Sequence, residues 1–88
     1  MTLAGPEITV RYFAGARAAV GVPEESITLP AGATVEDALA ALVNRHGAEL
    51  SRVLRASSFL LDGVAVRDRS VPLGDRRGLD VLPPFAGG

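Results

Sequence analysis

Hydrophobic and polar residues alternate along the first part of the chain, which predicts strands. In the run from Glu7 to Phe13 the residues of one face are apolar, namely Ile8, Val10 and Tyr12. A period of two is typical of a half-buried strand. A second strand is predicted over Glu25–Leu29, and the alanine-rich residues 14–20 predict a short helical turn that ends at Gly21. Together the two runs predict an antiparallel hairpin with a long connection.

The pattern changes to a helical period after residue 33. Thr34 can cap a helix, and Glu36 and Asp37 place negative charge in the first turn, where the helix dipole favours it. One buried face is predicted from apolar residues at helical spacing, which are Val35, Leu39, Leu42 and Val43. His46 and Gly47 are typical of a helix end. A short second helical piece is indicated by Leu50, Val53 and Leu54.

Strand patterns return in the last third of the chain. Residues 57–61 lead into Asp62-Gly63, a dipeptide typical of two-residue hairpin turns, and residues 64–66 return. A polar loop over residues 74–78 precedes the last strand, Leu79 to Leu82. The order of elements predicts the α+β class, as a roll in which one main helix packs across a mixed sheet.

The segment that follows the last strand is Pro83-Pro84-Phe85-Ala86-Gly87-Gly88. Each proline fixes φ near about −65° and favours an extended stem. Glycine has no Cβ, so Gly87 and Gly88 can thread a narrow channel. Such a tail reaches up to about 20 Å at about 3.3 Å per residue. We therefore expect a domain over residues 1–82 and an extended tail over residues 83–88, with the Gly88 carboxylate as its chemical handle.

Composition narrows the setting of this small domain. Cysteine is absent, which excludes disulfides, thiolate nucleophiles and cysteine-bound metals and fits the cytoplasm. A net charge of −1 gives no case for nucleic acid or an anionic membrane as partner. Residues 1–6 contain no basic region and no long apolar stretch, so we expect neither a signal peptide nor a membrane span.

The residue types that build common active sites are scarce. His46 is the only histidine, so a cluster of histidines cannot hold a metal, and we expect neither a metal site nor a Ser-His-Asp triad. Its place at a helix end favours a capping role. All 9 basic residues are arginine, so any lysine amine in the chemistry belongs to a partner. These residues give no sign of a self-sufficient enzyme.

With the tail and the order of elements in view, the chain resembles the ubiquitin-like sulfur carriers, and within them the small subunits of molybdopterin synthase. The resemblance rests on four segments, which are Val10–Ala14 with the following Ala-Arg-Ala-Ala-Val-Gly, Leu29–Ala41, Asp62-Gly63 and Leu82–Gly88. The chain departs from the family in the loop Asp75–Gly78, where the family commonly has an Asp-Gly-Asp-type turn.

The resemblance implies a ubiquitin-like β-grasp fold and a role in molybdenum cofactor biosynthesis. A ubiquitin-activating-like adenylyltransferase would use ATP to adenylylate the Gly88 carboxylate, and a sulfur donor would displace AMP to leave a thiocarboxylate. The large subunit of the synthase would bind the tail and pass the sulfur to cyclic pyranopterin monophosphate. The family pattern thus places ATP and the catalytic side chains with the partners, and no permanent cofactor on this chain.

A docking surface is expected beside the tail. Phe13 and Leu82 each fall out of phase with the core-facing residues of their strands, so both are predicted to point outward. An exposed apolar patch is a mark of a partner site. The expected partner-binding residues are Phe13, Leu82, Pro83, Pro84, Phe85 and Ala86. The alternative for Phe13 is that it closes a minor core.

Three other functions use the same features. A sulfur carrier for thiamine or cysteine biosynthesis has the same carboxylate handle with a different acceptor. A ubiquitin-like protein modifier would join the handle to lysines of other proteins. A plain interaction domain would carry the two glycines incidentally.

Overall fold

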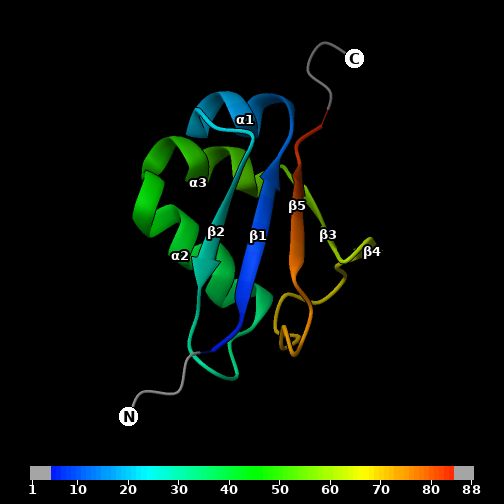
Figure 1. Ribbon diagram of the computed structural model, residues 1–88. Coiled ribbons are helices and arrows are strands. Elements are labelled where there is room, and N and C mark those ends of the chain that lie inside the picture. Colours follow the sequence, from blue (N-terminus) through cyan, green and yellow to red (C-terminus); the bar gives the residue numbers. More distant parts are fainter. Residues whose placement is uncertain (1–4, 85–88) are drawn as a thin grey trace.

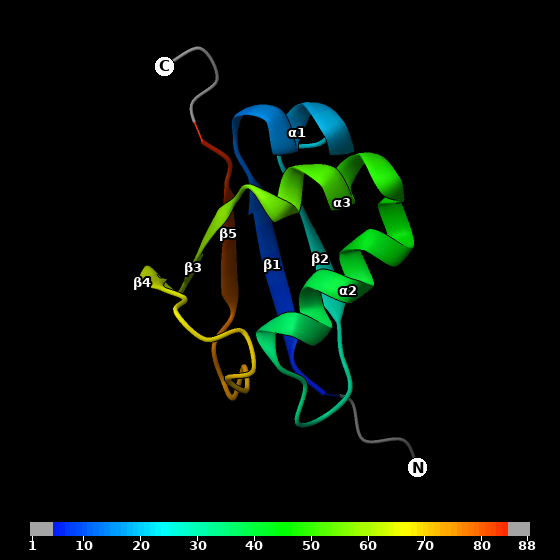
Figure 2. The same ribbon diagram turned by 180° about the vertical axis from the view of Figure 1, so that it is seen from behind.

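The computed structural model describes residues 5–84, which form a five-stranded sheet with helices packed on one of its faces. In chain order the elements are β1 (Glu7–Tyr12), α1 (Ala14–Val20), β2 (Glu24–Thr28), α2 (Val35–His46), α3 (Ala48–Arg55), β3 (Ser58–Leu61), β4 (Val64–Ala65) and β5 (Gly78–Leu82). Figure 1 views the sheet from its uncovered side, and Figure 2 views it from the side of the helices. The α+β class and the mixed sheet predicted from the sequence are confirmed.

The strands lie in the order β2-β1-β5-β3-β4, so the last strand of the chain sits at the centre of the sheet. β5 runs parallel to β1 on one side and antiparallel to β3 on the other. The predicted hairpin of β1 and β2 is antiparallel, and α1 forms part of its long connection. The strand that leads into the tail is therefore held on both edges.

The core lies between the sheet and the helices. The alternation predicted for β1 is confirmed, because Ile8, Val10 and Tyr12 are all buried. On α2 the predicted apolar face is also confirmed, with the larger part of it fully buried and Val43 partly buried against the core. α3 adds Leu50 and Leu54 to the same core. These aliphatic contacts attach the helices to one face and leave the other face free.

Local signals fix the ends of the elements. The Thr34 hydroxyl accepts a hydrogen bond from the Asp37 amide at 3.1 Å, and the Asp37 carboxylate accepts one from the Thr34 amide at 2.9 Å. This reciprocal capping box confirms the predicted start of α2. Asp62 and Gly63 both have positive φ, 49° and 83°, as a tight hairpin turn of this kind requires.

Asp62 has a second role that its sequence pattern did not reveal. Its carboxylate accepts a hydrogen bond from the Gly78 amide at 2.8 Å and longer ones from the Arg77 amide. These contacts attach the β3–β4 turn to the start of β5. The loop that departs from the family pattern is thus held by a side chain from the neighbouring hairpin.

Within residues 5–84, no helix combines the length and apolar character needed to cross a lipid bilayer.

Candidate functional site

The root of the C-terminal tail is the end of β5. There the Phe13 amide donates a hydrogen bond to the Val81 carbonyl at 3.2 Å, and Ser58 of β3 lies opposite Leu82. Both neighbouring strands therefore fix the direction in which the chain leaves the sheet, at the same end as α1. Pro83 is half-buried and Pro84 is exposed. The other four predicted tail residues lie outside the described part of the chain, namely Phe85, Ala86, Gly87 and Gly88.

Phe13 and Leu82 lie at this root, on the sheet face that carries no helix, here called the outer face. Their neighbours Tyr12 and Val81 are paired in register and are buried on the helix side. Because successive strand residues face opposite ways, the next residue on each strand points outward. Phe13 is 40% exposed and Leu82 is half-buried. The structure brings the two together, and their role in partner binding stays a prediction.

A third apolar residue on the outer face was not predicted. Leu60 of β3 is half-buried, and its register partner on β5 is Asp80, two residues before Leu82. Diagonal neighbours of this kind lie within reach of long side chains. We refer to Phe13, Leu60 and Leu82 as the tail-root patch. Strand alternation alone places Leu60 on this face, but the β3–β5 register was needed to bring it near the tail.

An ion pair lies beside the tail-root patch. Arg11 of β1 donates from Nε to Asp80 Oδ1 at 2.8 Å and from Nη2 to Oδ2 at 2.9 Å. Asp80 is only 7% exposed and is the one buried polar or charged residue among those described, whereas the Arg11 side chain is 56% exposed. The hydrogen bond and charge of Asp80 raise the pKa of Arg11 further above its already high value. The two parallel hydrogen bonds hold the side chains of the pair in one geometry.

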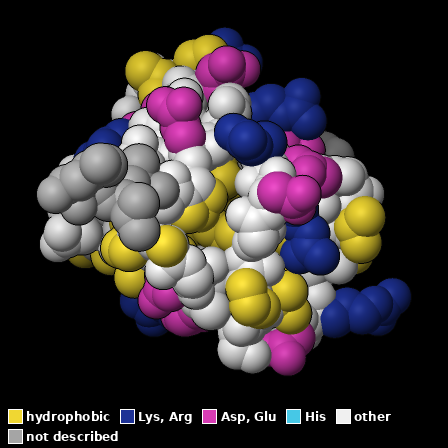
Figure 3. Space-filling model, turned by 60° about the horizontal axis from the view of Figure 1, so that its bottom comes forward, with side chains coloured by type: hydrophobic (Ala, Val, Ile, Leu, Met, Phe, Trp, Pro, Cys, Tyr) yellow, Lys and Arg dark blue, Asp and Glu magenta, His cyan; other side chains and the backbone are white. Residues whose placement is uncertain are grey.

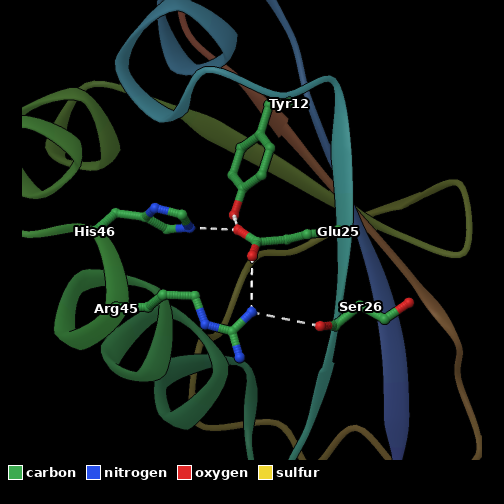
Figure 4. Close-up of polar contacts among 5 residues, drawn as sticks. All are labelled: Tyr12, Glu25, Ser26, Arg45 and His46. Carbon is green, nitrogen blue, oxygen red and sulfur yellow. Dashed lines mark hydrogen bonds and ion pairs between the residues drawn. The ribbon is translucent and has the colours of Figure 1, made fainter.

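A second polar cluster lies on the helix side, centred on Glu25 of β2 (Figure 4). The Tyr12 hydroxyl and His46 Nε2 both bond to Glu25 Oε2, and Arg45 Nη1 donates to Oε1 at 2.7 Å. The Tyr12 and His46 rings meet edge to face, with centroids 6.2 Å apart. The cluster thus ties the edge strand β2 to the last turn of α2.

The cluster corrects the interpretation of His46 as a capping residue. The Gly47 amide, and not His46, bonds to the Val43 carbonyl at the end of α2. His46 instead contacts a carboxylate contributed by β2. Alternation with the buried Ile27 places Glu25 on the helix side, but the sequence could not show that the end of α2 lies opposite it.

The ionisation of this cluster is set by its contacts. Partial burial would raise the pKa of Glu25, but hydrogen bonds from Tyr12, Arg45 and His46 outweigh it and hold the pKa below its usual value. Burial, followed by the hydrogen bond to Glu25, raises the pKa of the Tyr12 phenol. At neutral pH the cluster is therefore a charged Glu25 with a neutral Tyr12 donor. Its role is to hold β2 against α2.

Replacing Glu25 with alanine is expected to lower the free energy of unfolding at pH 7 by about 2–3 kcal/mol, because the Tyr12 hydroxyl loses its charged acceptor. The folded-state pKa of Glu25 is depressed, so its contribution is present above the unfolded pKa of about 4.3 and is lost as pH falls through the folded value. Urea unfolding at pH 7 and pH 3 measures the free energy of unfolding of the unaltered chain and of Glu25→Ala. The difference in that free energy between the two proteins should be smaller at pH 3 than at pH 7. Glu24→Ala at the exposed neighbouring position should change stability by under about 0.5 kcal/mol. An equal loss at both pH values would contradict the assignment.

A hollow of about 370 Å³ lies at the end of the molecule opposite the tail root, between the β3–β4 hairpin and the loop that follows it. Figure 3 shows that end of the molecule, where hydrophobic side chains lie among charged ones. The apolar lining includes Val35, Leu61, Val66 and Val71, with Arg67 and Arg76 beside them. Over residues 5–84 no group of three or more histidine, aspartate or glutamate side chains is placed to hold a metal ion.

Comparison with known proteins gives concordant matches. A model described as the ThiS family matches residues 10–88. The curated molybdopterin synthase sulfur carrier subunit of Chlamydomonas reinhardtii is 36% identical over an alignment of 83 residues, and the match covers 93% of this chain and 99% of that protein.

Solved structures with the same arrangement of strands and helices match as well. The small archaeal modifier protein 1 of Haloferax volcanii is 28% identical with a TM-score of 0.79, over 91% of this chain and 99% of that one. Subunit 1 of a molybdopterin converting factor from Pyrococcus furiosus is 27% identical with a TM-score of 0.77, over 91% and 99% of the two chains.

Proposed function

The chain belongs to the ThiS family, and from this premise we propose that it is the sulfur carrier subunit of a molybdopterin synthase. Its fold is the ubiquitin-like β-grasp fold that the sequence resemblance implied, shared with the solved relatives. The observation that carries the proposal is the identity of 36% to a curated sulfur carrier subunit over nearly the full length of both chains. The family match extends through the two glycines at positions 87 and 88.

The proposed chemistry takes place at the Gly88 carboxylate. A carboxylate is ionised at neutral pH and is a poor electrophile, so it must be activated first. An adenylyltransferase of the ubiquitin-activating type joins it to AMP from ATP and releases pyrophosphate. A sulfur donor then displaces AMP and leaves a thiocarboxylate. On the large subunit the sulfur passes to cyclic pyranopterin monophosphate, and water returns Gly88 to the carboxylate.

The residue types in this chain indicate which parts of the reaction belong to its partners. It has no lysine and no cysteine, and its one histidine is bonded to Glu25. The proposal therefore places the catalytic side chains on the large subunit and the ATP with the activating partner. This chain contributes the carried sulfur and the surface that docks it, and the exchange takes place in the cytoplasm.

Delivery of the tail is supported by the geometry of its root. β5 is bonded along both edges, so the tail starts from a fixed point on the sheet. Two prolines follow at once and restrict the backbone of the stem. The tail-root patch lies beside this point and gives a partner an apolar surface to cover. The large subunit is proposed to bind the patch and the tail together.

A second candidate function is favoured by a specific observation. The Haloferax volcanii relative at a TM-score of 0.79 is a small archaeal modifier protein, and a modifier would use the same activated Gly88 on the lysines of other proteins. A sulfur carrier for thiamine or cysteine biosynthesis is the remaining alternative. Each alternative uses the same Gly88 carboxylate as the main proposal. It differs in the molecule that receives the sulfur or, for a modifier, the chain itself.

The test is the intact mass of the chain after incubation with ATP, the adenylyltransferase and the sulfur donor of its own organism. The proposal predicts a gain of about 16 Da, as one oxygen is replaced by sulfur. In a parallel incubation with ATP and an extract of the same organism, a chain that gains no 16 Da but becomes joined to other proteins would support the modifier. A chain that forms neither product would contradict any activated-carboxylate function.

A further inference from the structure

Resting on the proposed function, we propose that the Arg11–Asp80 ion pair selects the large subunit. The partner it fits has an apolar surface with one uncharged hydrogen-bond acceptor, a carbonyl oxygen, placed opposite the Arg11 guanidinium. Partners that are apolar at this position are disfavoured by the same pair.

The position of the pair ensures that any partner on the tail-root patch also covers it. Arg11 and Asp80 are register partners on the outer face, two residues before Phe13 and Leu82 along the chain. Two strand residues span about 6.6 Å. A specific interface of ordinary size covers about 800 Å² on each side, so it extends well beyond that distance. The pair is therefore desolvated when the partner docks.

The hydrogen bonds of the pair leave its two members in different states. Both Asp80 oxygens accept a hydrogen bond from Arg11, and the side chain is already removed from water. Arg11 carries five N–H donors, and the described residues engage only its Nε and Nη2. The Nη1 group and one Nη2 hydrogen have no hydrogen-bond partner among residues 5–84, and the side chain is 56% exposed. The docked complex must satisfy these donors or leave them buried and unpaired.

The local charge decides which acceptor fits. Arg11 is paired with Asp80 on β5 and lies opposite Glu24 on β2, so one cation stands between two anions. A further carboxylate from the partner would be repelled by these two carboxylates. An uncharged carbonyl oxygen can accept the same hydrogen bonds without that repulsion. Asp80 also holds the guanidinium in place before binding, which lowers the ordering cost of docking. The pair thus presents preorganised donors at the edge of an apolar patch.

An unpaired buried donor weakens binding enough to discriminate between partners. One such group corresponds to a factor of about 10 to 100 in Kd. A partner without the acceptor therefore binds this face correspondingly more weakly than one that has it. Natural interfaces reach specificity by penalising the wrong partner in this way.

Two double variants test the proposal in binding to the large subunit, measured by calorimetry with the unaltered chain as reference. Arg11→Leu with Asp80→Val replaces the pair by apolar residues, and Arg11→Asp with Asp80→Arg keeps the pair but moves the guanidinium by one strand spacing, about 4.8 Å. We expect both to raise Kd at least tenfold. The loss should be the same at 50 mM and 500 mM salt, since the acceptor is uncharged. Thermal unfolding and amide spectra establish that each variant is folded.

The outcomes separate the inference from the function on which it rests. If the apolar variant binds as tightly as the unaltered chain, or more tightly, the pair is only structural and the inference is wrong. A loss that disappears at 500 mM salt would show a charged acceptor and would overturn the proposed partner chemistry. Failure of the unaltered chain to bind the large subunit at all would overturn the proposed function, and the inference with it.

Discussion

Removal of Gly88 is expected to abolish sulfur transfer while leaving the domain folded. The proposed reaction takes place at the carboxylate of this residue. Every step depends on the distance between that carboxylate and the end of β5. The shortened chain ends one residue nearer to β5 and presents a carboxylate displaced by about 3.3 Å. Near-attack geometry in an active site does not tolerate errors of that size. The core is built from residues 8–81, so stability should not change.

The measurement for this prediction is molybdopterin formation in a mixture of the chain, the activating enzyme, the sulfur donor and the large subunit. The chain without Gly88 should give no product above background, with an unchanged unfolding midpoint in urea. A control chain that lacks Thr2 is shortened by the same amount at the other end and should remain active. Product formation by the chain without Gly88 would show that the reaction does not depend on the carboxylate of that residue.

Replacing Leu82 with aspartate is expected to weaken binding to the large subunit by at least about 100-fold. Leu82 lies on the outer face at the tail root, so a partner that receives the tail must cover this position. An aspartate there would lose apolar contact and bury a charge without a partner. Its inward neighbour Val81 keeps the core contacts of β5, so the fold should tolerate the change.

Thr28→Asp is the matched control for Leu82→Asp. Thr28 is exposed and pairs with Glu7, at the end of β1 remote from Phe13. It receives the same new charge on the same face of the sheet, far from the tail root, and should bind the large subunit as the unaltered chain does. Equal loss of affinity in both variants would indicate a general charge effect. No loss in either would show that the partner does not use the outer face at the tail root.

The elements that could be predicted are those whose signals are local. Period-two alternation in β1, the capping box at Thr34 and the Asp62-Gly63 turn each depend on residues a few positions apart. Helix and strand bounds followed to within a residue or so for the same reason. β2 runs from Glu24 to Thr28 and not from Glu25 to Leu29, because its ladder with β1 ends there.

The contacts that escaped prediction are those that depend on register. Arg11 and Asp80 are 69 residues apart and meet only because β1 and β5 pair in parallel. Glu25 is one of two adjacent acidic residues, and its contacts with Tyr12 and His46 form only when β2 pairs with β1 and α2 packs on the sheet. For the tail, the residues indicated the Gly88 carboxylate as a handle, the family resemblance implied its chemistry, and the structure adds the position of the tail's root.

The central claim is that the chain delivers sulfur from Gly88 to a molybdopterin precursor. The most direct measurement is a single turnover in which the thiocarboxylated chain is mixed with the large subunit and cyclic pyranopterin monophosphate, with no activating enzyme present. The account predicts that molybdopterin forms, with one carrier consumed for each dithiolene sulfur, and that the chain loses about 16 Da as it returns to the carboxylate. A thiocarboxylate that persists in the assembled complex, with no molybdopterin formed, would contradict it.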